Sequence, residues 1–291
     1  MKEVLKNYGE LDVLGYYSKV ASYLRDFLKG KEIATKTYIN PKFFFLRRGS
    51  NSPSLLIDDL KAVDEKMLEL RKGSLKDVKN QLNGKQVLVW EYFVPRKLVQ
   101  LFYATNGEHS GKNIERIFID IDKTKDVKAE TAQEVAKKLI EIIKKDKEFN
   151  KLVKYKTFLM WTGNSFHIYL LLKKQVNKDF YDKYLAYHKN NPLDSFIGRW
   201  ASLIKEKTGI NVEGGHEKLK SKIIIDPSGT PSGKLARAPF SIHIDERALR
   251  IDGVAVPVSE QQLGDRNLVS KLRRLNPEKV LKNIKNYKKL L

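Results

Sequence analysis

The chain has 291 residues, of which 56 are Lys or Arg and 35 are Asp or Glu, so its formal net charge is +21. Hydrophobic residues make up 41% and aromatic residues 10%, which is typical of a globular protein and excludes a disordered chain. The lack of cysteine excludes disulfides and cysteine-ligated metal sites. No stretch predicts a membrane span or a signal peptide, so we expect a cytoplasmic protein without a membrane partner. The charge favours nucleic acid as a partner, with a lysine-rich stabilising surface as the alternative.

The hydrophobic pattern predicts helices and strands without internal repeats. Apolar residues at helical spacing from Val13 to Leu24 indicate the first helix, and three phenylalanines after Pro41 indicate a strand covered on both faces. Thr131 and Glu134 have the spacing of a capping box. In chain order we predict a helix within 1–30, a strand at 38–46, a helix at 55–70, strands at 86–93 and 115–122, a helix at 129–147, strands at 156–161 and 166–172, helical residues at 178–209, strands at 222–226 and 254–258, and a basic helical tail at 268–291.

Residues 115–122 are typical of a buried strand that ends in two carboxylates. Side chains alternate between the faces of a strand, so Asp120 and Asp122 project to one side with Cα atoms about 7 Å apart. Two carboxylates this close repel unless a cation lies between them, and Mg²⁺ or Mn²⁺ prefers such oxygen ligands. The pattern predicts a divalent-metal site, with two solvated aspartates at a strand end as the alternative.

Later segments carry further polar chemistry. The connection 162–165 joins two strands through small residues with exposed backbone amides, which favours anion binding. His167 follows on the second strand, where a packed core histidine is the alternative. The strand 222–226 ends in Asp226, which also suits the start of an Asp-Pro turn. The polar candidates downstream are Arg237, Ser241 and His243.

Arg47 and Arg48 stand beside small polar residues after the phenylalanine strand. Guanidinium groups make bidentate contacts with phosphate, so both arginines are candidates for binding nucleic acid. Lys234, in a loop rich in Gly, Pro and Ser, is a third candidate. An ordinary solvated turn is the alternative for each of them.

Together these segments resemble the archaeo-eukaryotic primase superfamily. Its motifs are an Asp-x-Asp strand, a small-Gly-x-x-x-His turn and strand, and a hydrophobic-Asp segment followed by Arg-x-Pro-x-Ser-x-His. The matching segments stand in the same order along this chain, and the similarity covers residues 115–245 well and 35–115 loosely. The matching segments are residues 118–122, 161–168, 225–226 and 235–243.

The resemblance implies an α+β fold in which an RRM-like antiparallel catalytic sheet packs with an N-terminal α/β module. We expect the α/β module at about 1–112 and the RRM-like module at about 113–262, together forming a catalytic domain at 1–262, with the basic helical tail at 263–291. The tail is a candidate for gripping the template or the initiating nucleotide, or for docking a helicase or accessory primase subunit. A packed helical pair with a solvated lysine face is the alternative.

The resemblance also implies the site. Asp120, Asp122 and Asp226 would hold two divalent ions, Mg²⁺ or Mn²⁺, which neutralise charge on the attacking 3′-hydroxyl and on the leaving pyrophosphate. The residues that would contact the incoming nucleoside triphosphate are Gly163, Asn164, Ser165, His167, Arg237, Ser241 and His243.

The implied function is that of a template-dependent primase-polymerase, a nucleotidyltransferase that binds single-stranded DNA template, primer and nucleoside triphosphates. The chain lacks the cysteines of the zinc-binding element of archaeal primase small subunits and has Asp245 where they tend to have a lysine. The missing cysteines suggest a plasmid, viral or accessory primase-polymerase, or a catalytic domain of a larger protein. Asp245 predicts that the sugar and phosphate contacts around His243 differ from those of the archaeal subunits. The alternatives are an extension-only end-joining or repair polymerase, a metal-dependent nuclease, and a non-catalytic RRM-like nucleic-acid-binding module. A nuclease has no need of a triphosphate-binding turn such as 162–167.

Overall fold

The computed structural model describes residues 12–41, 43–217 and 220–291. The helices are α1 Leu14–Leu24, α2 Glu65–Leu70, α3 Leu75–Val78, α4 Gly84–Tyr92, α5 Ala129–Lys145, α6 Lys147–Leu152, α7 Phe196–Thr208, α8 Leu268–Arg273 and α9 Pro277–Lys288. The strands are β1 Glu32–Asn40, β2 Phe43–Arg47, β3 Leu55–Leu56, β4 Leu98–Ala104, β5 Ile114–Lys123, β6 Tyr155–Trp161, β7 Phe166–Val176, β8 Val212–Gly214, β9 Ile223–Asp226, β10 Leu235–Arg237, β11 Ile242–Asp245, β12 Arg250–Val254 and β13 Val256–Val258.

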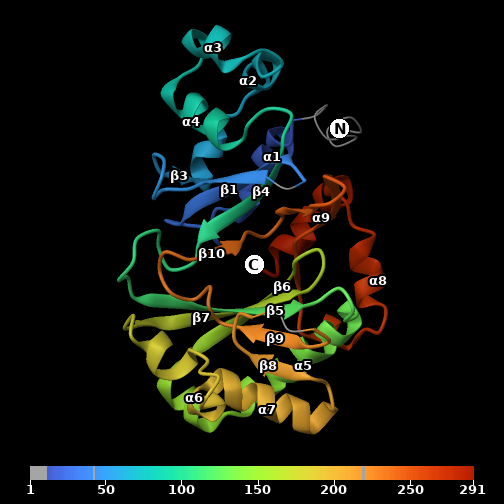
Figure 1. Cartoon of the computed structure of the whole chain (residues 1–291). Helices are drawn as coiled ribbons and strands as arrows, with labels where there is room; N and C mark the ends of the chain where they lie inside the picture. The colour runs from blue at the N-terminus through green and yellow to red at the C-terminus, as the bar shows by residue number, and fades with distance from the viewer. Residues whose placement is uncertain (1–11, 42, 218–219) are drawn as a thin grey trace.

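Two sheets lie one above the other in the middle of the molecule, and the α+β class is confirmed (Figure 1). The lower sheet has the order β13-β6-β7-β5-β9-β8 and is antiparallel except for the parallel pair β8–β9. Helices α5 and α7 pack on its outer face, and α2 to α4 lie at the far end of the molecule beyond the upper sheet (Figure 1). The Phe27 ring packs between the two sheets against Tyr103 and Tyr169. Among the described residues, no helix is long and apolar enough to cross a membrane.

The upper sheet does not follow the expected division at residue 112. Its order is β10-β4-β1-β2, with β3 also paired to β1. Strand β10 comes from the second half of the chain, and its Leu235 and Arg237 pair with Ala104 and Phe102 of β4. After strand β9 of the lower sheet, the chain returns to the upper sheet as β10. The two halves of the chain therefore share one hydrophobic core.

The strand predicted at 86–93 is wrong, because this segment forms the helix α4. The Asn83 side chain accepts a hydrogen bond from the Gln86 amide at 2.9 Å, and the Gln86 side chain accepts one from the Asn83 amide at 3.1 Å. This reciprocal capping box starts a helix despite the aromatic and β-branched residues that favour a strand. The neighbouring strand β4, which carries the pairing with β10, was not predicted.

The phenylalanine strand is also not covered on both faces. Strand β2 is at the edge of the upper sheet, and Phe43 and Phe44 are 58% and 46% exposed. The preceding strand β1, which begins at Glu32, takes the protected position beside it. A run of three phenylalanines shows that a segment is hydrophobic. It does not show whether the strand is central or at the edge of the sheet, and burial depends on that position.

Smaller differences concern helix limits. Helix α5 begins at Ala129 after the N-cap Lys128, so the capping box predicted at Thr131 is absent. The segment 55–70 contains the strand β3, a 3-10 turn and α2 instead of one helix. Within 178–209 only α7 is an α-helix, preceded by a single π-type turn at Tyr181–Leu185. The start of the helix predicted within 1–30 lies partly outside the described residues, and α1 confirms the rest.

The C-terminal helices belong to the packed body of the protein. Helix α9 lies against α1, with Val280 and Ile284 buried, and the Tyr287 ring approaches that of Phe240 with centroids 6.4 Å apart. The apolar face of α9 is therefore already used, and its lysines face outward. This arrangement corresponds to the packed helical pair that was the alternative for the tail.

Candidate functional site

Three of the predicted site residues lie in one row across neighbouring strands of the lower sheet. Asp120 of β5 stands opposite Asp226 of β9 on one side and opposite His167 of β7 on the other. Residues directly opposite each other in antiparallel strands point to the same face, so the three side chains converge. The His167 Nε2 lies 3.3 Å from the Asp120 Oδ1. Asp122, two residues further along β5, projects from the same face.

The Asp226 carboxyl is held in a setting that disfavours its charge. Burial raises its pKa above the usual value, and the nearby Asp120 carboxylate adds to the rise. The Ser228 amide donates to Asp226 Oδ1 at 2.8 Å and acts in the opposite direction without cancelling the effect. A raised pKa between two carboxylates is the electrostatic condition that a bound cation would relieve.

The predicted divalent-metal site stays a prediction. Within the described residues, no group of three or more His, Asp or Glu side chains is arranged to hold a metal ion. Asp120 is directed toward His167 and Asp226 toward the Ser228 amide. The donor type and the shared face nevertheless fit Mg²⁺ or Mn²⁺, because both ions prefer carboxylate oxygens and Asp226 is destabilised as a lone charge.

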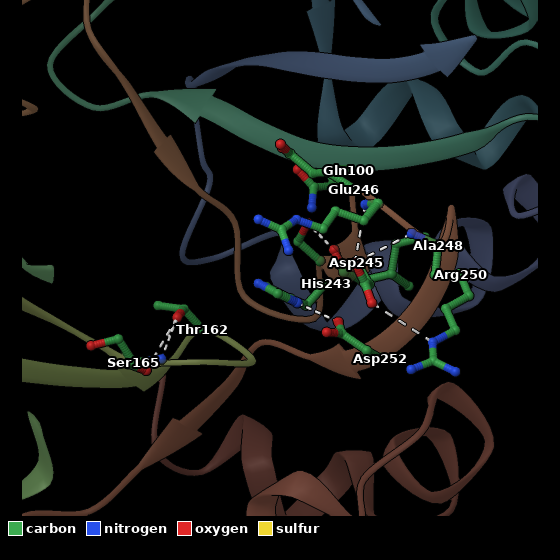
Figure 2. A network of polar contacts seen from close by, with 12 residues as sticks. Gln100, Thr162, Ser165, His243, Asp245, Glu246, Ala248, Arg250 and Asp252 are labelled. Atoms are coloured by element: carbon green, nitrogen blue, oxygen red, sulfur yellow. Dashed lines mark hydrogen bonds and ion pairs between the residues drawn. The ribbon is translucent and has the colours of Figure 1, made fainter. Parts of the chain in front are cut away.

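The turn 162–165 is shaped by Gly163. Its φ of +108° is one that residues with side chains rarely adopt, and a Cβ there would come within 3.0 Å of the His243 ring. Inside the turn, the Ser165 amide donates to Thr162 Oγ1 at 3.1 Å and the Thr162 amide donates to the Ser165 carbonyl at 2.9 Å. The turn is thus packed tightly against the hairpin formed by β11 and β12 (Figure 2).

The hydrogen-bond donors of Ser165, predicted to contact phosphate, are used within the protein in this structure. Its hydroxyl donates to the carbonyl of Ile121, between the two aspartates of β5. Both hydrogen-bond donors of Ser165, the amide and the hydroxyl, are therefore engaged inside the protein. They tie the turn to the end of the strand that carries Asp120 and Asp122.

Arg237 stands at the end of β10, between the two sheets. Its Nη1 donates to the carbonyl of Ile242 at 3.2 Å. Burial lowers the pKa of Arg237, and neighbouring tyrosines and Asp120 oppose that shift. The Tyr169 hydroxyl donates to the Arg237 carbonyl at 3.2 Å and lies 3.4 Å from His167 Nδ1, which links the arginine to the acidic row.

His243 extends from the β11–β12 hairpin toward the turn (Figure 2). Its Nδ1 pairs with the Asp252 carboxylate of β12. Asn164, Arg237 and His243 line one cavity of about 850 Å³, so three of the predicted nucleotide-binding residues face the same space. Lys123, which directly follows Asp122, lines this cavity as well and places it beside the acidic row.

Ser241 does not reach this cavity. It is fully buried, and its Oγ accepts a hydrogen bond from the Leu101 amide of β4 at 2.9 Å. In this structure the Ser241 hydroxyl is not exposed to a nucleotide, and its predicted contact stays a prediction. The serine instead fastens the end of β10 to the upper sheet, and a sequence motif does not distinguish a core hydroxyl from a surface one.

The predicted nucleic-acid contacts differ in their surroundings. Arg48 is committed to the protein, with its Nε paired to Glu108 and its Nη2 donating to the Gly233 carbonyl at 2.9 Å. Arg47 pairs with Glu91 at 3.1 Å and is partly exposed. Lys234 is exposed on the loop before β10. The exposed surface thus suits Arg47 and Lys234 better than Arg48.

Several cations that line the cavity escaped the sequence analysis. They come from the end of β5 and the loop after it, from the β11–β12 hairpin and from α8, which lie far apart along the chain. A sequence signal existed only for the first group, because lysines stand at three of the positions that directly follow the Asp-x-Asp motif. These residues are Lys123, Lys125, Lys128, Arg247 and Arg273.

No protein-family model matches the sequence, and no curated protein matches it either. The structure is similar to that of the polymerase domain from Mycobacterium tuberculosis Ligase D in complex with DNA, with a TM-score of 0.58. The match covers 94% of this chain and 88% of that chain at 16% sequence identity. A likeness at this identity shows a shared fold.

Proposed function

We propose that this protein is a DNA-directed nucleotidyl transferase, a primase-polymerase that joins nucleotides on a single-stranded template with release of pyrophosphate. The observation that carries the proposal is the row of Asp226, Asp120 and His167 beside a cavity lined with cations. These residues come from three separate motifs, and the fold brings them to one face. The fold shared with the polymerase domain of Ligase D supports the same assignment.

Asp120, Asp122 and Asp226 would hold the divalent ions, Mg²⁺ or Mn²⁺. Bound ions would neutralise charge on the attacking and leaving oxygens. The RRM-like character that the resemblance implies for the lower sheet remains part of this proposal. Its antiparallel strands are rigid supports for the three carboxylates, which is the kind of placement that a reactive site needs.

The chain's own residues would bind and orient the nucleotide. The Arg237 guanidinium, the His243 imidazole and the Asn164 amides face the cavity and would donate to phosphate or sugar oxygens. His167, fixed by its contact with Asp120, would support the carboxylate and present its ring to the nearest phosphate. Ser165 would act through the position of the turn, since its own donors are engaged.

The DNA would lie along the upper sheet. Phe44 is exposed, and the Lys36 ammonium lies 3.9 Å from the centre of its ring. Lys36 in turn pairs with Glu246, which lines the cavity, so this aromatic and cationic surface is continuous with the nucleotide site. Aromatic rings and positive charge together are typical of sites for single-stranded nucleic acid.

An extension-only repair polymerase is the second candidate. It is favoured by the fold likeness to the polymerase domain of Ligase D in complex with DNA. Both candidates need the same acidic row and the same nucleotide cavity, and they differ only in whether two free nucleotides can be joined. A metal-dependent nuclease is disfavoured, because it has no need of a turn and strand such as 162–167 that would bind a triphosphate.

The test is incubation with single-stranded DNA and labelled nucleotides in Mg²⁺ or Mn²⁺, with and without a primer. We expect primer extension, and for a primase-polymerase also products from nucleotides alone. The matched variants are Asp120→Asn, expected to be inactive, and Asp194→Asn, an exposed aspartate in the turn before α7, expected to retain activity.

The outcomes separate the candidates. Extension without products from free nucleotides would select the repair polymerase. Shortening of the labelled strand without any extension would select the nuclease. An Asp120→Asn variant as active as the parent would rule out the acidic row as the reacting centre.

A further inference from the structure

The cavity beside the acidic row has an unequal division of charge. Six Lys or Arg side chains and four Asp or Glu side chains line it. All four acidic groups have partners within the protein. Asp126 accepts from the Ser221 hydroxyl at 2.6 Å, Glu246 pairs with Lys36 at 2.8 Å, and Asp252 pairs with His243. The Asp245 carboxylate accepts from the Arg247 amide at 3.0 Å.

The Lys and Arg side chains that line the cavity have fewer salt-bridge partners than its acidic side chains. In the described part of the chain, Lys123, Lys125 and Lys128 have no salt bridge within 4.0 Å, and Arg273 has only a long contact of 3.9 Å to Glu130. This part of the cavity therefore holds positive charge that the protein itself does not neutralise.

The fold brings these four cations together, because the end of β5, the loop after it and helix α8 are neighbours. Lys123 ends β5, and Lys125 and Lys128 follow it in the loop that leads to α5. Helix α8 packs on α5 and brings Arg273 to the first turn of that helix. No side chain caps the start of α5, so its first amides add partial positive charge on the same side.

Their position relative to the carboxylates decides which phosphate they would meet. Strand β5 runs from Asp120 through Asp122 to Lys123, so the cations lie beyond the second carboxylate and away from Asp226. In phosphoryl transfer the attacking and leaving oxygens lie on opposite sides of the reacting phosphorus. Phosphates that depart past Asp122 would enter the part of the cavity that these cations line.

We propose that Lys123, Lys125, Lys128 and Arg273 form the subsite for the leaving pyrophosphate. The inference rests on the proposed function. The 3′-oxygen forms a bond to the α-phosphorus and releases its proton to solvent, while the bond from that phosphorus to the bridging oxygen breaks. The electron pair stays on the pyrophosphate, and the added negative charge increases its attraction to the four cations. The subsite thus sets the strength of product inhibition and the rate of the reverse reaction.

The test is a triple variant, Lys125→Gln/Lys128→Gln/Arg273→Gln, in the full chain. All three side chains are exposed or more than half exposed, so their loss leaves the core intact. The matched control is Lys147→Gln/Lys151→Gln, which removes exposed lysines from α6 on the outer side of the lower sheet. Pyrophosphate binding is measured by calorimetry with and without Mg²⁺, in the absence of nucleotide and DNA. Inhibition of primer extension by pyrophosphate is measured in parallel.

We expect the triple variant to bind pyrophosphate about tenfold more weakly and to need about tenfold more of it for inhibition, since three charge contacts are lost. The KM for the nucleotide changes less, and the control variant behaves like the parent. Unchanged pyrophosphate binding and inhibition would overturn the subsite. An equal rise in nucleotide KM without selective relief of inhibition would also overturn it, because the cations would then hold the incoming nucleotide.

Failure of the proposed function has a different signature. A parent protein that makes no product, yet binds pyrophosphate through these cations, would refute the polymerase assignment and leave the four cations as a pyrophosphate-binding site only. A parent that extends primers while the triple variant keeps full pyrophosphate binding would retain the assignment and refute the subsite.

Discussion

Asp226 lies directly opposite Asp120 across the β5–β9 strand pair, so two carboxylates from distant parts of the chain face the same side of the sheet. The pair is buried enough to raise the pKa of Asp226. Such an arrangement costs stability in the protein alone and becomes favourable when a cation binds.

Replacing Asp226 by Asn should stabilise the metal-free protein and abolish activity. The folded-state pKa of Asp226 is raised, so its stabilising contribution is present below the unfolded-state pKa and is lost as pH rises through the folded-state pKa. At neutral pH the Asp226→Asn variant should therefore melt at a higher temperature than the parent. Activity should fall about 10³-fold, equivalent to about 4 kcal/mol at 1.36 kcal/mol per tenfold.

The control for this prediction is Asp194→Asn, which should change neither the melting temperature nor the activity. Thermal melting is recorded in chelator and then in Mg²⁺. The stabilising effect of Asp226→Asn should shrink or reverse in Mg²⁺, because only the parent gains from the ion. A variant that is less stable than the parent in chelator would contradict the charge repulsion inferred here.

Replacing Gly163 by Ala should weaken nucleotide binding through a steric effect on the turn. The new Cβ would come within 3.0 Å of the His243 ring, and the φ of +108° adds backbone strain. Gly30→Ala is the matched control, because Gly30 also has a positive φ of +68° but no atom within 4 Å of a Cβ. The control should cost about 1–2 kcal/mol of stability and leave the nucleotide KM unchanged.

The difference between the two glycine variants isolates the contact with His243. Nucleotide KM and melting temperature are measured for both. If Gly163→Ala raised KM no more than Gly30→Ala, the turn and the hairpin would not act together on the nucleotide.

Replacing Arg48 by Ala should destabilise the fold more than it weakens DNA binding. Its guanidinium pairs with Glu108, whose side chain is fully buried, so truncation leaves an uncompensated buried carboxylate worth about 3 kcal/mol. Arg47→Ala, which breaks a partly exposed pair with Glu91, should cost at most about 1 kcal/mol. Urea denaturation measures both, and DNA titration measures the affinity.

The contribution of the Arg48–Glu108 pair should depend on pH. Burial alone would raise the pKa of Glu108, but Arg48 and the Ser50 amide hold it below its usual value. A depressed folded-state pKa gives stability that is present above the unfolded-state pKa and lost as pH falls through the folded-state pKa. The stability difference between the parent and Arg48→Ala should therefore shrink in acid. A difference that stayed constant down to pH 3 would contradict the ion pair as its cause.

Replacing Phe44 by Ala should weaken binding of single-stranded DNA by about 1–3 kcal/mol, the value of one base stacked on an aromatic ring. The exposed ring is close to Lys36, and it contacts the Tyr38 ring, with centroids 6.0 Å apart. Leu193→Ala is the control, since Leu193 is 61% exposed in the turn before α7. Fluorescence titration with labelled single-stranded DNA measures both, and equal affinities would place the DNA elsewhere.

Much of the lower sheet and its covering helix α5 could be predicted from the sequence. The strands β5, β6, β7 and β9 and the helix α5 follow their hydrophobic periodicity, because each forms around one buried face. The grouping of Asp120, His167 and Asp226 was also expected from their motifs, and the strand register now gives it a geometric basis. Their catalytic roles remain predictions.

The features that the sequence concealed depend on which segments become neighbours. The exposed Phe44, the buried Ser241 and the pairing of Arg48 with Glu108 all depend on how residues far apart in the chain pack together. So does the crossing of β10 into the upper sheet. Local patterns indicated most elements of the lower sheet and the three candidate carboxylates, because periodicity and charge can be read along the chain. Only the tertiary structure decided which polar groups face the cavity, because burial and pairing are set by packing across the two sheets.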